Sequence, residues 1–335
     1  MIYMVNNKKN LLIVLNSLAN KRIIVIGDMV ADIYLHGTIE RISREAPVLV
    51  LQQAAQKIVA GGAANVVNNI ATLSGNVAAA GILGDDSAAA GLKKILADSN
   101  ADTDGLLTSA KRTTITKTRI IAGGRATVSQ QVVRIDHDNN TPLDDFDEKL
   151  LLKKLQSLLP QSEGIVLSDY GSGTITPAIR EFVIDYSRKY NIPCIVDSRY
   201  DIQAFIGVTY VKQNDAELAS AVNMVINTDA DLHKAGFLLL KKLNAKGVLV
   251  TCGEKGMVLF EANGKVSNIP VSDKSEVYDV SGAGDTCVAT FILAVAAGNT
   301  PLLAAELSNY AAGIAVRKIG TATVSTAELK FILEK

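Results

Sequence analysis

The sequence is poor in cysteine and contains no tryptophan and no long apolar run. Its three cysteines, Cys194, Cys252 and Cys287, are far apart in the chain, and such a sparse, odd set suits reduced core residues better than a disulfide framework. No apolar segment reaches the roughly 18 residues that a membrane helix needs. The first twenty residues lack the basic start and the long apolar centre of a signal peptide. These absences predict a cytoplasmic protein.

The charge has no excess of either sign. Thirty-four basic residues balance 34 acidic residues, and no block of Lys and Arg stands out in the sequence. We therefore expect neither a nucleic acid nor a membrane surface as a partner. The P-loop pattern G-x-x-x-x-G-K-[ST] is missing, and no G-x-G-x-x-G follows the first expected strand. Any phosphate must be bound by another arrangement.

The chain does have enough apolar residues for a large core, with 48% hydrophobic against 20% charged residues. A β-branched run at Arg22–Gly27 predicts a buried strand, and strand-like and helix-like segments alternate in the second half of the chain. This pattern predicts an α/β fold with a mostly parallel central sheet covered on both faces. Two segments, about 33–58 and 107–136, predict a small separate β-sheet that acts as a lid. We expect an N-terminal helix over 1–20 and the main domain over 21–335.

The segment Asp279–Asp285 has the sequence D-V-S-G-A-G-D and precedes an apolar run that predicts a helix. Small residues at a helix start leave backbone N–H groups uncovered, and the helix end carries a partial positive charge, so an anion is expected there. Asp285 stands at the mouth of this pocket, where a carboxylate can accept the proton of a hydroxyl that attacks a phosphoryl group. An ordinary strand-to-helix turn capped by an aspartate would use the same residues.

Further polar candidates lie near the amino-terminal end of the main domain. Asp28 and Asp32 follow the first strand at the edge where open α/β sheets bind ligands, and are candidates for bonding sugar hydroxyls, with solvated loop acids as the alternative. Gly61 and Gly62 allow close approach of the backbone, and Asn65 offers a donor and an acceptor to a diol. A plain helix start would also explain these three residues.

Three basic residues, Lys117, Arg119 and Arg134, lie in the expected lid. Directed inward, they would suit an anionic group on a substrate. Directed outward, they would be solvated, which is the default for any one of them.

The run D-x-[ST]-G-A-G-D resembles the C-terminal signature of the ribokinase or PfkB family of sugar kinases. The resemblance extends over nearly the whole chain and implies a ribokinase-like three-layer sandwich with ATP as the phosphoryl donor. It also implies that Asp285 is the catalytic base and that the amides of Gly282, Ala283 and Gly284 form the anion hole.

Other segments look like the ligand sites of that family. The residues Asp28, Asp32 and 61–65 resemble its sugar-binding elements. The segment from Asn214 to Glu217 matches its N-x-x-E motif, in which Glu217 would organise the hydration shell of Mg²⁺.

The nucleotide and cation sites implied by the resemblance lie further along the chain. The turn 251–256 is similar to the family's nucleotide-binding turn, and Asn309 stands in a segment that looks like its adenine-side helix. The residues assigned in that turn are Thr251, Gly253 and Gly256. Asp279 with the loop 320–325 is similar to the monovalent-cation site of many members, for which K⁺ is the expected ion.

The chain resembles in particular the members that phosphorylate D-glycero-β-D-manno-heptose 7-phosphate. Four stretches carry this resemblance: 41–48, 114–119, 167–170 and 277–280. It implies phosphorylation of the anomeric hydroxyl to a 1,7-bisphosphate, on the route to ADP-heptose and the lipopolysaccharide inner core. The lid cations suit a substrate that already bears a phosphate. The chain departs from the pattern at three places: Ser172 for Lys, Ser198-Arg199 for Pro-Lys, and Lys212-Gln213 for Thr-Pro.

Two other functions stay open at this point. One is a kinase of the same family acting on another sugar, sugar phosphate or nucleoside, and the other is a kinase-like binding protein without turnover, against which the intact Asn214, Glu217 and Asp285 speak. Exposed lid strands can pair between subunits, so we expect a homodimer. The chain ends near Lys335 without the nucleotidyltransferase domain of bifunctional relatives, so we expect another protein to perform the adenylyl transfer.

Overall fold

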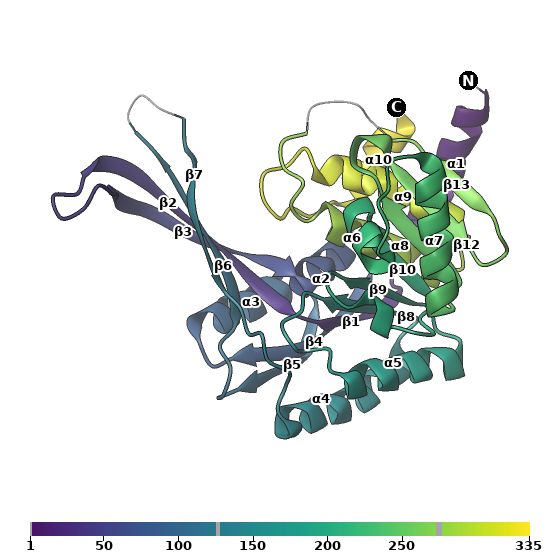
Figure 1. The fold of residues 1–335 in the computed structure, drawn as a ribbon, viewed down its shortest axis with the longest axis horizontal. Coiled ribbons are helices and arrows are strands. Elements are labelled where there is room, and N and C mark those ends of the chain that lie inside the picture. The colour runs from purple at the N-terminus through teal and green to yellow at the C-terminus, as the bar shows by residue number, and fades with distance from the viewer. Residues whose placement is uncertain (1, 125–127, 273–276) are drawn as a thin grey trace.

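A nine-stranded sheet forms the centre of the molecule (Figure 1). The computed structural model describes residues 2–124, 128–272 and 277–335. The strand order is β13-β12-β11-β10-β9-β8-β1-β4-β5, parallel from β11 to β5 and antiparallel at β12 and β13. These strands are β1 Arg22–Gly27, β4 Asn76–Gly84, β5 Asp102–Ser109, β8 Gly164–Asp169, β9 Cys194–Ser198, β10 Tyr210–Asn214, β11 Gly247–Thr251, β12 Met257–Glu261 and β13 Val266–Ile269.

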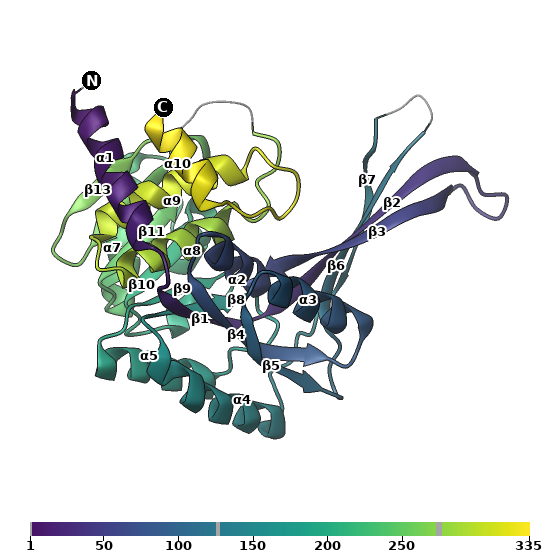
Figure 2. The ribbon, with the colours of Figure 1, turned by 180° about the vertical axis from the view of Figure 1, so that it is seen from behind.

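Helices cover both faces of this sheet (Figures 1 and 2). One face packs on α1 Ile2–Ser17, α2 Ala63–Thr72, α3 Ser87–Asp98, α8 Ala283–Ala296, α9 Pro301–Ala315 and α10 Thr326–Glu334. The other packs on α4 Asp145–Leu158, α5 Pro177–Tyr190, α6 Asp215–Val222 and α7 Asp229–Leu243. Successive residues of β1 enter opposite cores, as the two-residue period of a strand requires. The three-layer α/β sandwich expected from the sequence is confirmed.

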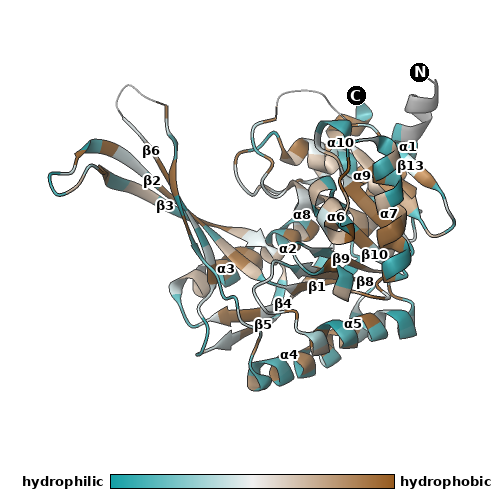
Figure 3. Ribbon diagram, in the orientation of Figure 1, coloured by the Kyte–Doolittle hydropathy of each residue, from teal (hydrophilic) through white to brown (hydrophobic). Residues whose placement is uncertain are grey.

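Hydropathy explains the layers. Figure 3 shows hydrophobic residues concentrated along the central strands and hydrophilic residues on the outer turns of α4 and α5. The expected N-terminal helix is α1, whose residues Leu11, Val14 and Leu15 are at most 3% exposed, as is Leu18 just after it, and α1 packs toward α9 and α10. Within the described ranges, no helix is both long enough and apolar enough to cross a membrane.

The lid is a second sheet of order β3-β2-β6-β7 that projects from the main sheet (Figure 1). It consists of β2 Met29–Ile42, β3 Leu49–Gly62, β6 Ile115–Gly123 and β7 Gln130–His137. The two expected antiparallel hairpins are present, joined by a parallel β2–β6 pair. The expected range 107–136 starts inside β5, which pairs with β4 in the main sheet instead. Residues 125–127 of that range lie outside the described residues.

Candidate active site

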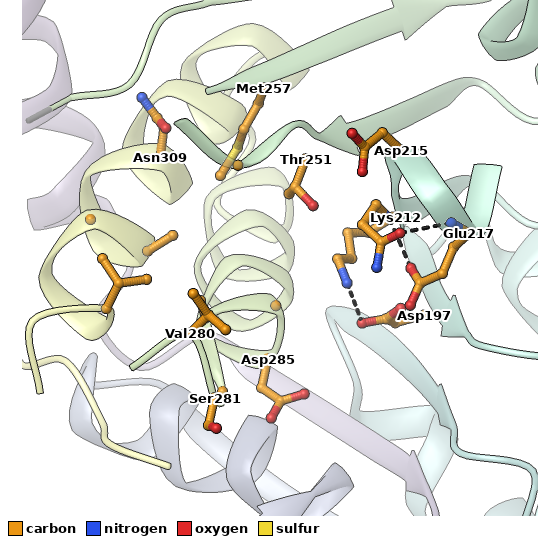
Figure 4. Close-up of a pocket in the computed structure, with 18 of the residues that line it drawn as sticks. Asp197, Lys212, Asp215, Glu217, Thr251, Met257, Val280, Ser281, Asp285 and Asn309 are labelled. Carbon is orange, nitrogen blue, oxygen red and sulfur yellow. Dashed lines mark hydrogen bonds and ion pairs between the residues drawn. The ribbon is translucent and has the colours of Figure 1, made fainter. Parts of the chain in front are cut away.

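The carboxyl ends of the central strands open into a cavity of about 720 Å³ beside the start of α8 (Figure 4). Its volume is typical of small-molecule sites. It is lined by the residues that the sequence assigned separately to catalysis and to nucleotide or Mg²⁺ binding. They are Asn214, Glu217, Thr251, Gly253, Gly256, Gly282, Ala283, Gly284, Asp285 and Asn309.

The start of α8 presents uncovered backbone amides to this cavity. Gly282 is the N-cap residue with φ of 78°, a conformation that favours glycine, and a Cβ there would lie only 2.6 Å from Nδ2 of Asn65. The N–H of Ala283 donates to the carbonyl of Val280 at 3.3 Å. The N–H groups of Gly284 and Asp285 have no acceptor among the residues that the structure describes. These two amides of the first turn are therefore available to an anion, and the N–H of Gly282 likewise has no acceptor among the described residues.

Asp285 lies in the first turn of α8 and is 5% exposed. Its Oδ1 accepts a hydrogen bond from the Tyr170 hydroxyl, and its Oδ2 accepts one from Nδ2 of Asn65, both at 2.8 Å. Burial raises the pKa of Asp285 to about 6, although both hydrogen bonds act to lower it. A carboxylate with this pKa is ionised at neutral pH and is a stronger base than an ordinary aspartate.

Asn65 is held beneath Asp285 by a chain of side-chain hydrogen bonds. Its Oδ1 accepts from Nδ2 of Asn69 at 3.2 Å, and Oδ1 of Asn69 accepts from the Thr286 hydroxyl at 3.0 Å. Asn65 is fully buried, and its amide group donates to Asp285. This geometry lets Asn65 position Asp285, and its expected contact with a sugar diol stays a prediction.

Asp28 is also placed differently from its expected role in sugar binding. It is 0% exposed and lines neither of the two cavities described here. Its carboxylate accepts the backbone N–H groups of Tyr170, Ser172 and Thr174 at 2.8, 3.0 and 3.1 Å. Asp28 therefore holds the loop after β8 that carries Tyr170.

Asp32 and Arg119 form an ion pair at the base of the lid. Their N–O distance is 2.5 Å, with 3% and 14% of the side chains exposed, and neither residue lines the two cavities. Gly61 packs on this pair, because a Cβ there would lie 2.5 Å from Oδ2 of Asp32. Gly62 is the N-cap of α2. Asp32, which was expected to bind a sugar hydroxyl, and Arg119, which was expected to bind a substrate phosphate, thus neutralise each other's charge.

Asn214 and Glu217 form a capping box at the start of α6. Asn214 Oδ1 accepts the Glu217 N–H at 2.7 Å, and Glu217 Oε2 accepts the Asn214 N–H at 2.8 Å. The box has a structural role, and Glu217 also lines the cavity beside Asp215 (Figure 4). The described ranges contain no cluster of three or more His, Cys, Asp or Glu side chains able to hold a metal. The two carboxylates fit a Mg²⁺ ion that keeps most of its waters.

The end of the cavity that the sequence assigned to a nucleotide lies away from Asp197, where Figure 4 shows Thr251, Met257 and Asn309. Asn309 is 6% exposed, and its Nδ2 donates to the carbonyl of Pro270 at 2.7 Å. Apolar residues and uncovered glycine backbone at this end suit the flat face of a nucleobase.

Asp279 connects the motif to the loop expected at the monovalent-cation site. Its Oδ1 accepts the Ser281 N–H at 2.8 Å, and its Oδ2 accepts the Gly320 N–H at 2.9 Å. Burial alone would raise the pKa of Asp279, but these amides outweigh it and lower the pKa. The expected segments are therefore adjacent and carry a negative charge, and the cation itself stays a prediction.

A second cavity, of about 200 Å³, lies between the lid and the core. Lys117 and Arg134 of the lid line it together with Tyr170 and Arg199 of the core. The ammonium of Lys117 and the guanidinium of Arg199 lie 5.7 and 4.6 Å from the centre of the Tyr170 ring. Arg134 pairs with Asp136 at 2.8 Å and is half exposed. Of the three lid cations, two face this cavity and Arg119 does not.

Three residues of the site were not assigned from the sequence: Tyr170, Arg199 and Lys212. Tyr170 belongs to a stretch used only for the family resemblance, and the other two stood out only as departures from the family's pattern. All three line the main cavity. Tyr170 and Arg199 directly follow two adjacent parallel strands, and Lys212 lies in the last three residues of the next one, a signal that could have found them.

Solved structures share this fold. The ribokinase of Arabidopsis thaliana, complexed with ribose and ATP, matches with a TM-score of 0.74 and 20% identity over 95% of this chain and 99% of that chain. The phosphofructokinase-2 of Escherichia coli, in complex with potassium, matches with a TM-score of 0.73 and 20% identity over 94% and 98%. The class is therefore that of ribokinase-like α/β proteins.

The chain belongs to the pfkB family of carbohydrate kinases, whose model matches residues 20–328. Among similar proteins, the bifunctional protein HldE of Azorhizobium caulinodans is 39% identical over 93% of this chain. The bifunctional protein HldE of Gluconobacter oxydans is 40% identical over 92% of this chain. The chain spans 64% and 63% of the length of these two relatives.

Proposed function

We propose that the protein is an ATP-dependent kinase that phosphorylates the anomeric hydroxyl of D-glycero-β-D-manno-heptose 7-phosphate. The observation that carries the proposal is Asp285, a buried base with a pKa of about 6 beside two uncovered amides in a cavity of nucleotide size. The acceptor is inferred from the four stretches that resemble heptose 7-phosphate kinases and from the similarity to HldE. The 1,7-bisphosphate product would serve the synthesis of ADP-heptose for the lipopolysaccharide inner core.

In the proposed mechanism, Asp285 takes the proton of the attacking hydroxyl while the new O–P bond forms in line with the bond that breaks to ADP. The N–H groups of Gly284 and Asp285 bind the negative charge on the moving phosphoryl group. Tyr170 and Asn65 keep the carboxylate directed into the cavity. Asp215 and Glu217 would hold Mg²⁺, which neutralises phosphate charge when bound. Closure of the lid would exclude water as a competing acceptor.

The phosphate already on the acceptor fits the second cavity. Lys117, Arg134 and Arg199 line its wall together with the carboxylates Asp136 and Asp138. Asp136 pairs with Arg134, so Lys117 and Arg199 are the cations expected to meet a phosphate. Arg199 also lines the main cavity, so the two compartments adjoin. Ser172, where the heptose kinases have Lys, lines the same small cavity. The guanidinium of Arg199 supplies a cation there from the end of β9, which supports a phosphorylated acceptor despite this departure.

A substrate panel tests the proposal. ADP formation would be measured with heptose 7-phosphate, fructose 6-phosphate, ribose and adenosine, and the product would be identified by phosphorus NMR. We expect kcat/KM to favour heptose 7-phosphate by about 10² or more. A preference for another acceptor would reject the heptose assignment, and no ADP formation with any acceptor would reject the kinase.

Variants of the lid test where the acceptor phosphate binds. Lys117→Ala should raise KM for heptose 7-phosphate about tenfold and leave KM for ATP unchanged. Lys57→Ala is a matched control, because Lys57 is an exposed lysine of the same sheet that lines neither cavity. Equal effects of the two substitutions would contradict the assignment.

We also propose that a second copy of this chain covers the lid. The outer lid carries apolar side chains that are 48–56% exposed at Val48, Leu49, Val133 and Ile135, and edge strands of this kind are normally covered. Sedimentation should show a dimer that Val133→Asp with Ile135→Asp converts to a monomer. A wild-type monomer at micromolar concentration would contradict the proposal.

A further inference from the structure

Arg112 lies in the segment between β5 and β6, where the chain enters the β6–β7 hairpin of the lid. Its guanidinium donates from Nη1 to the carbonyl of Thr141 at 2.8 Å and from Nη2 to the carbonyl of Ser172 at 2.5 Å. Thr141 belongs to the segment that leads from β7 back to α4, and Ser172 belongs to the loop after β8 that carries Tyr170. One side chain therefore joins both connections of this hairpin to the Tyr170 loop.

The two connections of the hairpin are also bonded to each other and to the core. Oγ1 of Thr113 lies 2.7 Å from Nε2 of His137, and Nδ2 of Asn139 donates to the carbonyl of Thr113 at 2.6 Å. The N–H of Thr114 donates at 2.8 Å to Oδ2 of Asp86, the N-cap residue of α3. The base of the hairpin is therefore a fixed support against which Arg112 holds the Tyr170 loop.

Arg112 and Asp28 hold the Tyr170 loop from opposite sides. Asp28 is 0% exposed and accepts backbone N–H groups of the loop, including that of Ser172 at 3.0 Å, while Arg112 binds the carbonyl of the same residue. Burial acts to lower the pKa of Arg112, and the charge of Asp28 is the largest effect that opposes it. Hydrogen bonds to charged groups are stronger than those between neutral groups, so removal of either charge should loosen the loop.

The position of this loop affects both cavities. The Tyr170 hydroxyl donates to Oδ1 of Asp285 at 2.8 Å, and Ser172 lines the second cavity. A Cβ at Gly173 would collide with the carbonyl of Thr141, so the loop packs directly on the connection that Arg112 also binds. A shift of the loop away from this connection would move the donor that Asp285 receives.

We propose that Arg112 is a positioning residue that sets the hydrogen bond from Tyr170 to Asp285 by holding the loop after β8 against the base of the β6–β7 hairpin. The inference rests on the proposed function only in taking Asp285 as the base. Arg112 lines neither cavity, so it acts through Tyr170 and not on a ligand.

The test begins with Arg112→Met, which keeps an unbranched side chain and removes the charge and the donors. The Tyr170 hydrogen bond lowers the pKa of Asp285, so its loss should move the acid limb of kcat/KM to higher pH by about half a unit or more. Lys111→Met is the matched control, because Lys111 is the preceding residue, pairs with Asp144 at 2.5 Å and lines neither cavity. Its pH profile should be that of the wild type.

A double variant separates an effect through Tyr170 from a direct effect of the Arg112 charge. In the Tyr170→Phe background, Arg112→Met should move the acid limb no further, because the hydroxyl that Arg112 positions is already absent. Arg112→Lys keeps the charge with a different donor geometry, should shift the limb less than Arg112→Met, and serves for the same comparison if Arg112→Met does not fold. Additive shifts in the double variant, or loss of stability in Arg112→Met with a wild-type pH profile, would overturn the inference.

A titration without turnover distinguishes failure of this inference from failure of the proposed function. Carbon-13 NMR of labelled aspartate, with the Asp285 signal assigned by Asp285→Asn, should show titration near pH 6 in the wild type and at higher pH, by the same amount, in Arg112→Met and Tyr170→Phe. The other charged groups that act on Asp285, Asp197 of β9 and Lys212 of β10, are the same in all these proteins. Equal titration of the wild type and Arg112→Met would overturn the inference, whichever acceptor the protein phosphorylates.

Discussion

Two buried aspartates at the same end of the sheet, Asp28 and Asp285, have opposite surroundings. Asp28 accepts three backbone N–H groups from a single loop and lines neither cavity. Asp285 accepts two hydrogen bonds from side chains and faces the main cavity. Both are at most 5% exposed, so burial alone does not distinguish a structural carboxylate from a base.

The groups that donate hydrogen bonds to Asp28 and to Asp285 account for the difference between the two carboxylates. Backbone amides of one loop tie that loop to Asp28, and the hydrogen-bonding capacity of the carboxylate is used within the fold. The two side-chain donors at Asp285 orient the carboxylate but do not offset its burial, which raises its pKa to about 6. A base needs this incomplete stabilisation, because a fully satisfied carboxylate has little tendency to accept a proton.

The largest effect is expected from Asp285→Asn. The substitution keeps the shape and removes the base, so turnover at pH 8 should fall by about 10² or more, with ADP affinity nearly unchanged. Steady-state kinetics and calorimetry measure these two quantities. Near-normal turnover in this variant would remove the distinction between the two aspartates.

The same variant should be more stable than the wild type at high pH. The folded-state pKa of Asp285 is raised from 3.8 to about 6, so the associated stability is complete below pH 3.8 and is lost as the pH rises through 6. Asn does not ionise, and the free energy of unfolding at pH 8 should therefore rise by up to about 3 kcal/mol. Urea unfolding at pH 4 and pH 8 checks the sign, and a larger gain at pH 4 would contradict it.

A smaller and different effect is expected from Asp28→Asn. An amide oxygen cannot accept from all three loop N–H groups, and one unsatisfied group costs about 1–3 kcal/mol of unfolding free energy. Turnover should change less than Asp285→Asn changes it, because Asp28 acts only through the loop. Urea unfolding and kinetics on the same preparation test this. A large loss of turnover without loss of stability would contradict the structural role of Asp28.

The smallest effect is expected from Tyr170→Phe and concerns the pH dependence of kcat/KM. The phenol donates to Asp285 and lowers its pKa, so its removal should raise the pKa further and move the acid limb of kcat/KM to higher pH by about half a unit or more. Phe keeps the ring on which Arg199 stacks at 4.6 Å. A pH profile identical to that of the wild type would show that the acid limb belongs to another group.

Local signals made much of the fold predictable. The helix α6 and the strand β11 carry clear local signals in the sequence, since capping residues and β-branched runs act within a few positions. The helix α10 was missed although Ser325 and Glu328 form a capping box that the sequence displays. The strand β5 was missed because Asp102, Asp104 and Gly105 hide its strand pattern.

The site was predictable only in part, because its partners are set by topology. The glycine motif and the nucleotide-side residues line one cavity, and each carries its own local signature. The pairing of Asn65 with Asp285 spans 220 residues, and Asp32 meets Arg119 across the lid. Which of these donors and acceptors satisfy one another depends on strand order and register, which no local pattern specifies.

The Tyr170 ring and the Arg199 guanidinium form a partition common to both compartments. A ligand bound in one cavity would immobilise these two side chains. A ligand that then binds in the other cavity would lose less conformational entropy. The hydroxyl of the same ring donates to the carboxylate of Asp285, the proposed base. ATP and the sugar would therefore each bind more tightly when the other is bound. Hydrolysis of ATP would be slow in the absence of the sugar.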